Sequence, residues 1–177
     1  GVNPNNQSEL IQTGVDTWKS TDGGANFTKK SFWNLWSFNQ ISVNSPEGGP
    51  SYVHADIHEV KYHPSIPDKL FLATDGGIFS SDDGGETFIT HNGGLQTTQF
   101  YPSISSSFQD SAFVIGGTQD NATYVFRGDP SWFRVIGGDG MSTAVRPDDD
   151  NIVFGSAQRL YLVKSFDNGY SFSYSEP

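Results

Sequence analysis

The octapeptide Ser81-Asp82-Asp83-Gly84-Gly85-Glu86-Thr87-Phe88 decides the fold, because the chain contains two further copies of it. The copies are Ser20-Thr21-Asp22-Gly23-Gly24-Ala25-Asn26-Phe27 and Ser165-Phe166-Asp167-Asn168-Gly169-Tyr170-Ser171-Phe172. A glycine takes a positive φ at no steric cost, and Ser and Asp side chains hydrogen-bond to nearby backbone amides. The shared Ser, Asp, Gly and Phe therefore predict a tight structural hairpin, with the Phe ring buried between neighbouring sheets.

Each octapeptide lies near the end of a longer repeated unit, in which a Pro and an apolar stretch come first. Asp22 and Asp83 are 61 positions apart, and Asp83 and Asp167 are 84 positions apart. The second gap fits two units of about 42 residues, the length of a propeller blade of four short strands. Residues 112–136 form a degenerate copy that fills this gap without an octapeptide.

These units predict an all-β fold of β-propeller blades, each a sheet of four antiparallel strands with an octapeptide hairpin. We expect about four blades in a single partial propeller, the first without its innermost strand. The blades are predicted at residues 1–38, 52–98, 99–137 and 138–177, with an insertion or linker at 39–51. Because an open end exposes sheet edges and apolar faces, remaining blades of the same or another chain are expected to complete the ring.

The strands of the second blade are predicted at residues 53–62, 69–74, 77–81 and 87–90. A Trp/Phe-rich stretch around residues 31–50, before this blade, carries four aromatic residues, Phe32, Trp33, Trp36 and Phe38. They are either a surface for a sugar or protein partner or a cover for the edge of a blade.

Composition and charge exclude several classes of partner. The net charge is −10, so nucleic acid and anionic membrane surfaces would be repelled. The chain has no Cys, which excludes disulfides and thiolate metal sites. No apolar run approaches the roughly 18 residues of a membrane span. Divalent cations and neutral sugars remain as candidate ligands.

The turns between the second and third strands of each blade are predicted to share one face with the starts of the inner strands. This places the candidate ligand-binding residues at one mouth of the central channel. They are His54, Asp56, His58, Asp75, Gln99, Gln119, Asp120, Asn121, Asp139 and Gln158. The carboxylates can equally stabilise turns, since Asp-Gly and Asp-Asn favour them.

A divalent metal is one candidate cofactor. His54, Asp56 and His58 alternate along residues 53–62, so in a strand they point the same way. Two imidazoles and a carboxylate suit a metal ion. The alternative is that the three side chains line a wet channel and bind neighbouring strands or water.

The octapeptides resemble the Asp-box (BNR) repeat superfamily, which includes sialidases, the sortilin propeller and xyloglucanases. The segments 53–58, 74–77, 116–121 and 137–140 look most like large secreted bacterial proteins of this superfamily. A sialidase is disfavoured because the four Arg residues of the chain do not match the arginines that grip a sialate. The resemblance implies a secreted or cell-surface location, and the chain is predicted to be a glycan- or protein-binding module.

The alternative function implied by the resemblance is a glycoside hydrolase of the xyloglucanase type. Such an enzyme needs two facing carboxylates, and the catalytic candidates are Asp56, Asp75, Asp120 and Asp139. A third hypothesis is that the blades only scaffold a larger assembly.

Overall fold

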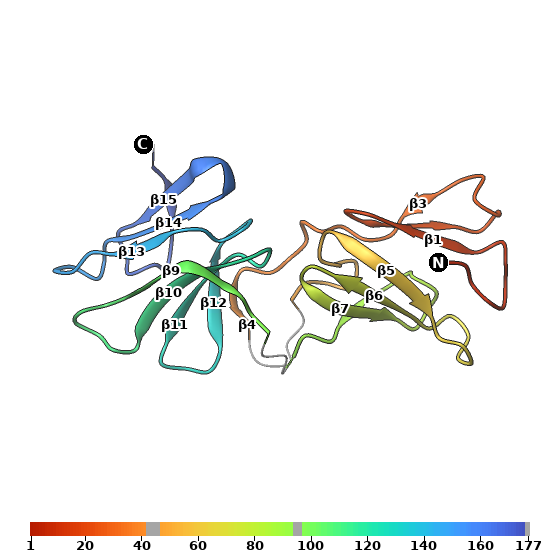
Figure 1. Cartoon of the computed structure of the whole chain (residues 1–177), viewed down its shortest axis with the longest axis horizontal. Helices are drawn as coiled ribbons and strands as arrows, with labels where there is room; N and C mark the ends of the chain where they lie inside the picture. Colours follow the sequence, from red (N-terminus) through yellow and green to blue (C-terminus); the bar gives the residue numbers. More distant parts are fainter. Residues whose placement is uncertain (42–46, 94–96, 176–177) are drawn as a thin grey trace. The chain divides into compact units, whose positions relative to one another are not determined.

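The computed structural model describes residues 1–41, 47–93 and 97–175, and these form antiparallel sheets (Figure 1). Apart from the short 3-10 turn η1 (Gln158–Leu160), the described residues contain no helix. Nor do they hold a helix long and apolar enough to cross a membrane. The chain divides into two compact units, one of Gly1–Ser37 and Asn44–Gly94 and one of Phe38–Val43 and Leu95–Pro177.

The first unit contains two sheets. The first sheet consists of β1 (Leu10–Thr13), β2 (Thr17–Ser20) and β3 (Thr28–Lys29). The second sheet consists of β5 (Ile57–Tyr62), β6 (Leu70–Thr74), β7 (Gly77–Ser81) and β8 (Ile89–Thr90). In each sheet the strands follow one another in chain order, as in a propeller blade.

The core of the first unit lies between these two sheets. Leu70 and Leu72 alternate along β6 and are fully buried, and Phe79 of β7 pairs with Leu72 and is buried beside them. Ile11 of the first sheet and Phe88 of the hairpin belong to the same cluster. The alternation explains why these residues form strands with one face against the neighbouring sheet.

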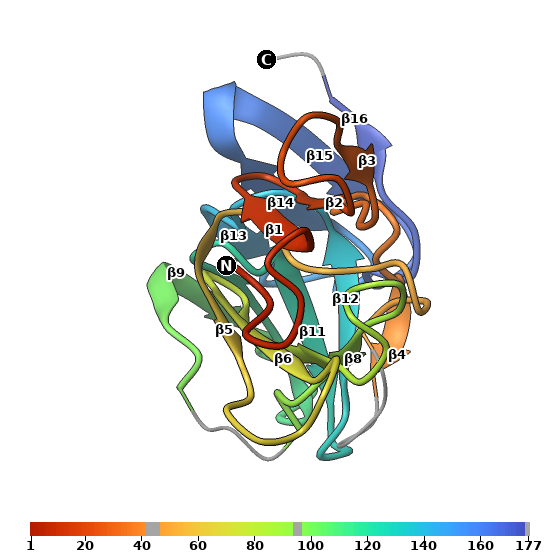
Figure 2. The ribbon, with the colours of Figure 1, turned by 90° about the vertical axis from the view of Figure 1, so that its right-hand side faces the viewer.

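The second unit contains the third and fourth sheets. The third includes β9 (Phe100–Ser106), β10 (Phe113–Thr118), β11 (Thr123–Arg127) and β12 (Trp132–Ile136). The fourth consists of β13 (Thr143–Val145), β14 (Val153–Ala157), β15 (Tyr161–Ser165) and β16 (Ser173–Tyr174), of which Figure 2 labels all four. Phe113, Ile115, Val125 and Val153 form the buried core between them.

The predicted all-β class, the blades of antiparallel strands and the degenerate third copy are confirmed. The third sheet holds a finding that the sequence did not indicate. Its edge strand β4 (Asn39–Ile41) comes from the predicted insertion 39–51 and pairs with β12, as Figure 1 shows. Residues 42–46 of that insertion lie outside the described residues. The prediction that further blades complete a ring stays a prediction.

Candidate functional site

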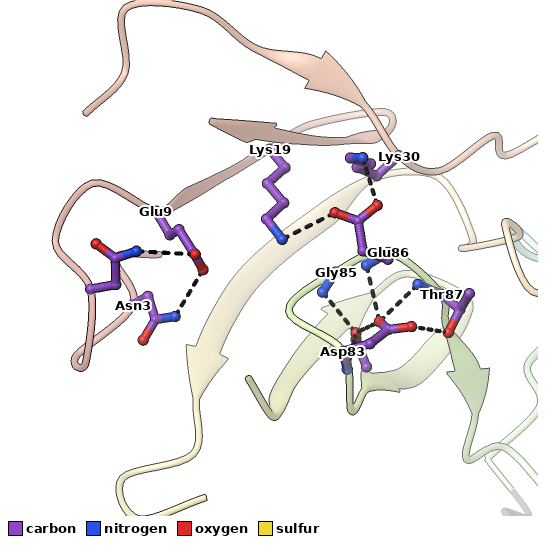
Figure 3. Close-up of polar contacts among 10 residues, drawn as sticks. Asn3, Glu9, Lys19, Lys30, Asp83, Gly85, Glu86 and Thr87 are labelled. Carbon is purple, nitrogen blue, oxygen red and sulfur yellow. Dashed lines mark hydrogen bonds and ion pairs between the residues drawn. The ribbon is translucent and has the colours of Figure 1, made fainter. Parts of the chain in front are cut away.

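The three octapeptide hairpins share one hydrogen-bonding pattern. In the second, Ser81 Oγ donates to Asp83 Oδ1 at 2.7 Å and accepts from the Gly85 amide at 2.8 Å. The Thr87 amide donates to Asp83 Oδ1 at 2.9 Å, as Figure 3 shows. The equivalent bonds of the first hairpin are 2.8, 2.9 and 2.9 Å, and those of the third are 2.7, 2.8 and 2.9 Å. The Ser and Asp side chains are therefore used inside the turns.

These bonds hold the three carboxylates in the charged form. Hydrogen bonds led by those from Asn26 and from Ser171 lower the pKa of Asp22 and of Asp167, each to about 2. At Asp83, burial alone would raise the pKa, but the hydrogen bonds from Thr87 and Ser81 outweigh it and lower the pKa to about 2.

The second and third hairpins also contact the preceding sheet of their own unit. In the first unit, Lys19 Nζ lies 3.1 Å and Lys30 Nζ 2.6 Å from the two carboxylate oxygens of Glu86 (Figure 3). In the second unit, Arg127 donates to the side chain and carbonyl of Asn168 and lies 3.9 Å from the ring centre of Tyr170.

The terminal Phe residues differ between the hairpins. Phe88 is 4% exposed, and Phe172 packs against the core of the second unit. Phe27 is 38% exposed, so the predicted burial between sheets does not hold for it.

The predicted alternation of His54, Asp56 and His58 on one strand is wrong. β5 begins only at Ile57, so His54 and Asp56 precede the strand. Asp56 has a φ of 58°, which turns the chain there, and a register shift between Ile57 and Glu59 makes a bulge at His58. A strand pattern in the sequence does not reveal such a turn.

His58 pairs instead with a turn residue. Its Nε2 lies 2.5 Å from Asp75 Oδ1, and the Asp75 amide donates to the Asp56 carbonyl at 3.3 Å. The structure thus brings His58, Asp56 and Asp75 together at one end of the second sheet. Among the described residues, no group of three or more His, Asp or Glu side chains is placed to hold a metal ion.

The second unit gathers the other predicted residues. The Gln119 amide donates to the Gln99 carbonyl at 3.0 Å, and the Asp139 amide donates to Gln158 Oε1 at 3.0 Å. The turn between β10 and β11 that contains Asp120 and Asn121 is joined to the β12–β13 connection by the Ala122 amide, which donates to the Gly138 carbonyl at 2.9 Å. These contacts hold the turns and the start of β9 at one end of the sheets.

Tyr101 of β9 belongs to this group and was missed in the sequence. The backbone that precedes it is tied to the β10–β11 turn, because Phe100 pairs with Thr118 and the Gln99 carbonyl accepts from the Gln119 amide. Desolvation, together with the charges of Asp139 and Asp120, raises the pKa of Tyr101. The signal available in the sequence was an aromatic residue close to the polar Gln99 in the first strand of a blade. We name this group the turn cluster: Gln99, Tyr101, Gln119, Asp120, Asn121, Asp139 and Gln158.

The turn cluster offers carboxylate and amide groups beside an aromatic ring, which suits hydrogen bonding to hydroxyl groups and stacking. We also predicted that this cluster and the His58–Asp75 pair meet at one mouth of the channel. The cluster lies in the second unit and the pair in the first, so this stays a prediction.

The aromatic residues of the Trp/Phe-rich stretch differ in their burial. Trp36 is partly buried and packs against the core cluster of the first unit. Phe32 and Trp33 are 38% and 47% exposed, and the Lys29 ammonium lies 4.7 Å from the Phe32 ring centre. The partner-surface alternative therefore remains open for Phe32 and Trp33.

Comparisons with known proteins give fold similarities only. No family model and no curated protein matches the chain. Among solved structures, a GH74 xyloglucanase from Xanthomonas campestris is 16% identical, over 99% of this chain and 29% of that chain, with a TM-score of 0.38. A GH74 enzyme from Niastella koreensis is 18% identical, over 98% of this chain and 28% of that chain, with a TM-score of 0.40. YCF48 from Cyanidioschyzon merolae is 12% identical, over 79% of this chain and 40% of that chain, with a TM-score of 0.34. The chain spans less than a third of the length of the two GH74 enzymes, and similarities at this level do not indicate a shared activity.

Proposed function

We propose that this chain is a secreted or cell-surface propeller module of the Asp-box type that binds a neutral glycan at its turn cluster. The observation that supports this best is a set of hydrogen bonds at one end of the second unit. It joins the start of β9, the β10–β11 turn and the β12–β13 connection, the segments that carry Tyr101, Asp120 and Asp139. Carboxylates accept hydrogen bonds from sugar hydroxyls, and an aromatic ring packs against the apolar face of a pyranose.

The turns of the cluster also support recognition. Asp120 has a φ of 59° and lies in a short turn whose backbone is hydrogen-bonded on both sides. The Asp139 amide is held by Gln158 of the fourth sheet. A site on backbone that is fixed in this way pays less ordering entropy on binding than one on a loose loop.

A test compares binding of neutral oligosaccharides by isothermal titration calorimetry in three proteins. We expect Asp139→Asn to weaken binding by about 10-fold or more, because a charged acceptor to a hydroxyl is lost. The matched control is Asp129→Asn in the turn after β11, where Asp129 accepts only a local bond from Ser131. Equal affinity of all three proteins for every sugar bound, or no binding of any neutral glycan, would refute the proposal.

The second candidate is a glycoside hydrolase, favoured by one observation. Asp120 and Asp139 lie in two connections that the hydrogen bond from the Ala122 amide to the Gly138 carbonyl joins, so two carboxylates belong to one group of turns. Release of reducing sugar from a β-glucan by the native chain, lost in both Asp120→Asn and Asp139→Asn, would establish it. Binding without release favours the module.

A further inference from the structure

The fourth sheet carries a pair of exposed tyrosines. Tyr161 begins β15 and Tyr174 ends β16, and their ring centres lie 5.3 Å apart with 33° between the ring planes. Tyr161 is 48% and Tyr174 55% exposed. We name this pair the tyrosine platform, because two adjoining rings in contact with water offer an apolar surface with polar hydroxyl ends.

The strand register shows which face of the sheet carries the platform. Tyr174 pairs with Val163, and Tyr161 lies two residues before Val163 on β15, so all three share one face. Gly155, which also pairs with Val163, lies against the third sheet, since a Cβ on it would be 2.3 Å from Ile136 Cδ1. The platform therefore belongs to the face that packs on the third sheet within the second unit. Its exposure does not depend on what lies against the opposite face.

The platform continues the turn cluster across the fourth sheet. Gln158, in the β14–β15 turn, accepts from the Asp139 amide at 3.0 Å, and a Cβ at Gly138 would lie 2.3 Å from Gln158 Oε1. Tyr161 follows three residues after Gln158 and begins the next strand. Neighbouring strands lie about 4.8 Å apart, so the path from β14 to β16 adds about 10 Å to the cluster, more than the length of one sugar ring.

The turn that joins the cluster to the platform has an unfavourable backbone. Arg159 and Leu160 have φ values of 63° and 58°, in the left-handed region that bulky side chains seldom adopt. Leu160 is 68% exposed, so its own burial does not offset this cost. Backbone strain of this kind is concentrated at ligand-binding sites. The turn therefore holds Gln158 and Tyr161 in place against the local backbone preference.

We propose that Tyr161 and Tyr174 form a second sugar subsite, so that the ligand of this protein is a linear neutral oligosaccharide and not a single sugar. The inference rests on the proposed function and adds the length of the glycan to it. One end of the glycan donates hydroxyl hydrogen bonds to the turn cluster, and the apolar face of a later pyranose packs on the platform. A disaccharide at the cluster does not extend to the tyrosines.

The test is calorimetric titration with linear glucans, mannans and xylans, each from the disaccharide to the hexasaccharide. We expect the affinity of the native chain to rise with the length of the glycan it binds. Tyr161→Ala should weaken binding of the hexasaccharide by about 10-fold and leave the disaccharide unchanged, because only the stacking ring is lost. Tyr161→Phe keeps the ring and should bind as the native chain does. Tyr174→Ala serves as a second variant if Tyr161→Ala does not fold, as judged by circular dichroism.

The matched control is Phe166→Ala, which removes an exposed aromatic ring directly after the other end of β15. It should bind every sugar as the native chain does. An affinity that does not change with length, or a Tyr161→Ala variant that binds the hexasaccharide normally, would overturn the subsite and leave binding at the cluster intact. An equal loss for the disaccharide and the hexasaccharide in Tyr161→Ala would also overturn it. A native chain that binds none of the sugars would refute the proposed function, and the subsite with it.

Discussion

At the residue scale, each octapeptide hairpin depends on one carboxylate that several donors share. Asp83 Oδ1 accepts from Ser81 Oγ at 2.7 Å, from the Glu86 amide at 3.0 Å and from the Thr87 amide at 2.9 Å. Turn amides cannot find partners in a sheet ladder, so the side chain takes that role. The repeated Ser and Asp are explained by this local need and require no ligand.

The lowered pKa values of these carboxylates predict acid lability. A group whose pKa is about 2 in the folded chain and near 4 when unfolded stabilises the fold above pH 4. That stability is lost as the pH falls from about 4 toward 2. Urea unfolding followed by fluorescence between pH 2 and 6 measures the loss.

Replacing one hairpin carboxylate measures its own contribution to the free energy of unfolding. Asp83→Ala should lower the free energy of unfolding by about 1–2 kcal/mol at pH 7, because four amide or hydroxyl donors lose their acceptor. The change should be smaller at pH 2, where the native carboxyl is partly protonated. The control is Glu59→Gln, an exposed carboxylate of β5 that pairs with Lys61. An equal loss in both variants at pH 7 would contradict the assignment.

At the element scale, the sheets of each unit are joined where a hairpin rests on the preceding sheet. Strand alternation buries Leu70 and Leu72 on one face of β6, and the hairpin Phe88 extends the same apolar layer. Ile11 of β1 completes the layer from the other sheet. Burial of such side chains stabilises the pairing by about 1.5–3 kcal/mol each.

Two glycines at matched positions separate turn geometry from this packing. Gly24 and Gly85 have φ values of 92° and 88°, so alanine costs each about 1–2 kcal/mol through the left-handed backbone. At Gly85 the added methyl would also meet Ile11 Cδ1 at 2.9 Å, whereas at Gly24 its nearest neighbour is Leu10 Cδ1 at 3.5 Å. We expect Gly85→Ala to destabilise the fold by about 1 kcal/mol more than Gly24→Ala, because the end of the buried Ile11 side chain must shift. Equal midpoints in thermal unfolding would contradict this.

At the scale of the whole molecule, the net charge restricts the classes of binding partner. The net charge of −10 and the pI near 4.5 favour neutral or cationic partners. The two units each carry their own core, and the turn cluster lies wholly in the second. The glycan binding proposed for the turn cluster therefore involves residues of the second unit.

This charge predicts chromatographic behaviour. At about 0.1 M salt, where charges are screened beyond about 10 Å, the chain should pass through a heparin column and bind an anion exchanger. Retention on heparin at that salt would show a local basic surface that the overall charge conceals.

The sequence by itself determined the hairpins and most strands, because these arise from interactions within a few residues. Ser, Asp and Gly at fixed spacing specify a turn, and alternating apolar residues specify a buried strand face. The second, third and fourth strands of the second blade were predicted at 69–74, 77–81 and 87–90, and β6, β7 and β8 lie there. The degenerate third blade was predicted from the repeat length and from the strand-like pattern of residues 112–136, although it lacks an octapeptide.

Only the tertiary structure decided the features in which the chain departs from its local sequence pattern. β4 gains its partner β12 from a distant part of the chain, which no short-range signal encodes. Because of the turn at Asp56 and the bulge at His58, two of the residues predicted for one strand lie outside it, and His58 pairs with Asp75. The segments that carry Tyr101, Asp120 and Asp139 are separate in the sequence and are joined only by hydrogen bonds of the folded chain. Such contacts depend on long-range packing, whose free energy is set by surfaces that form after the local hairpins.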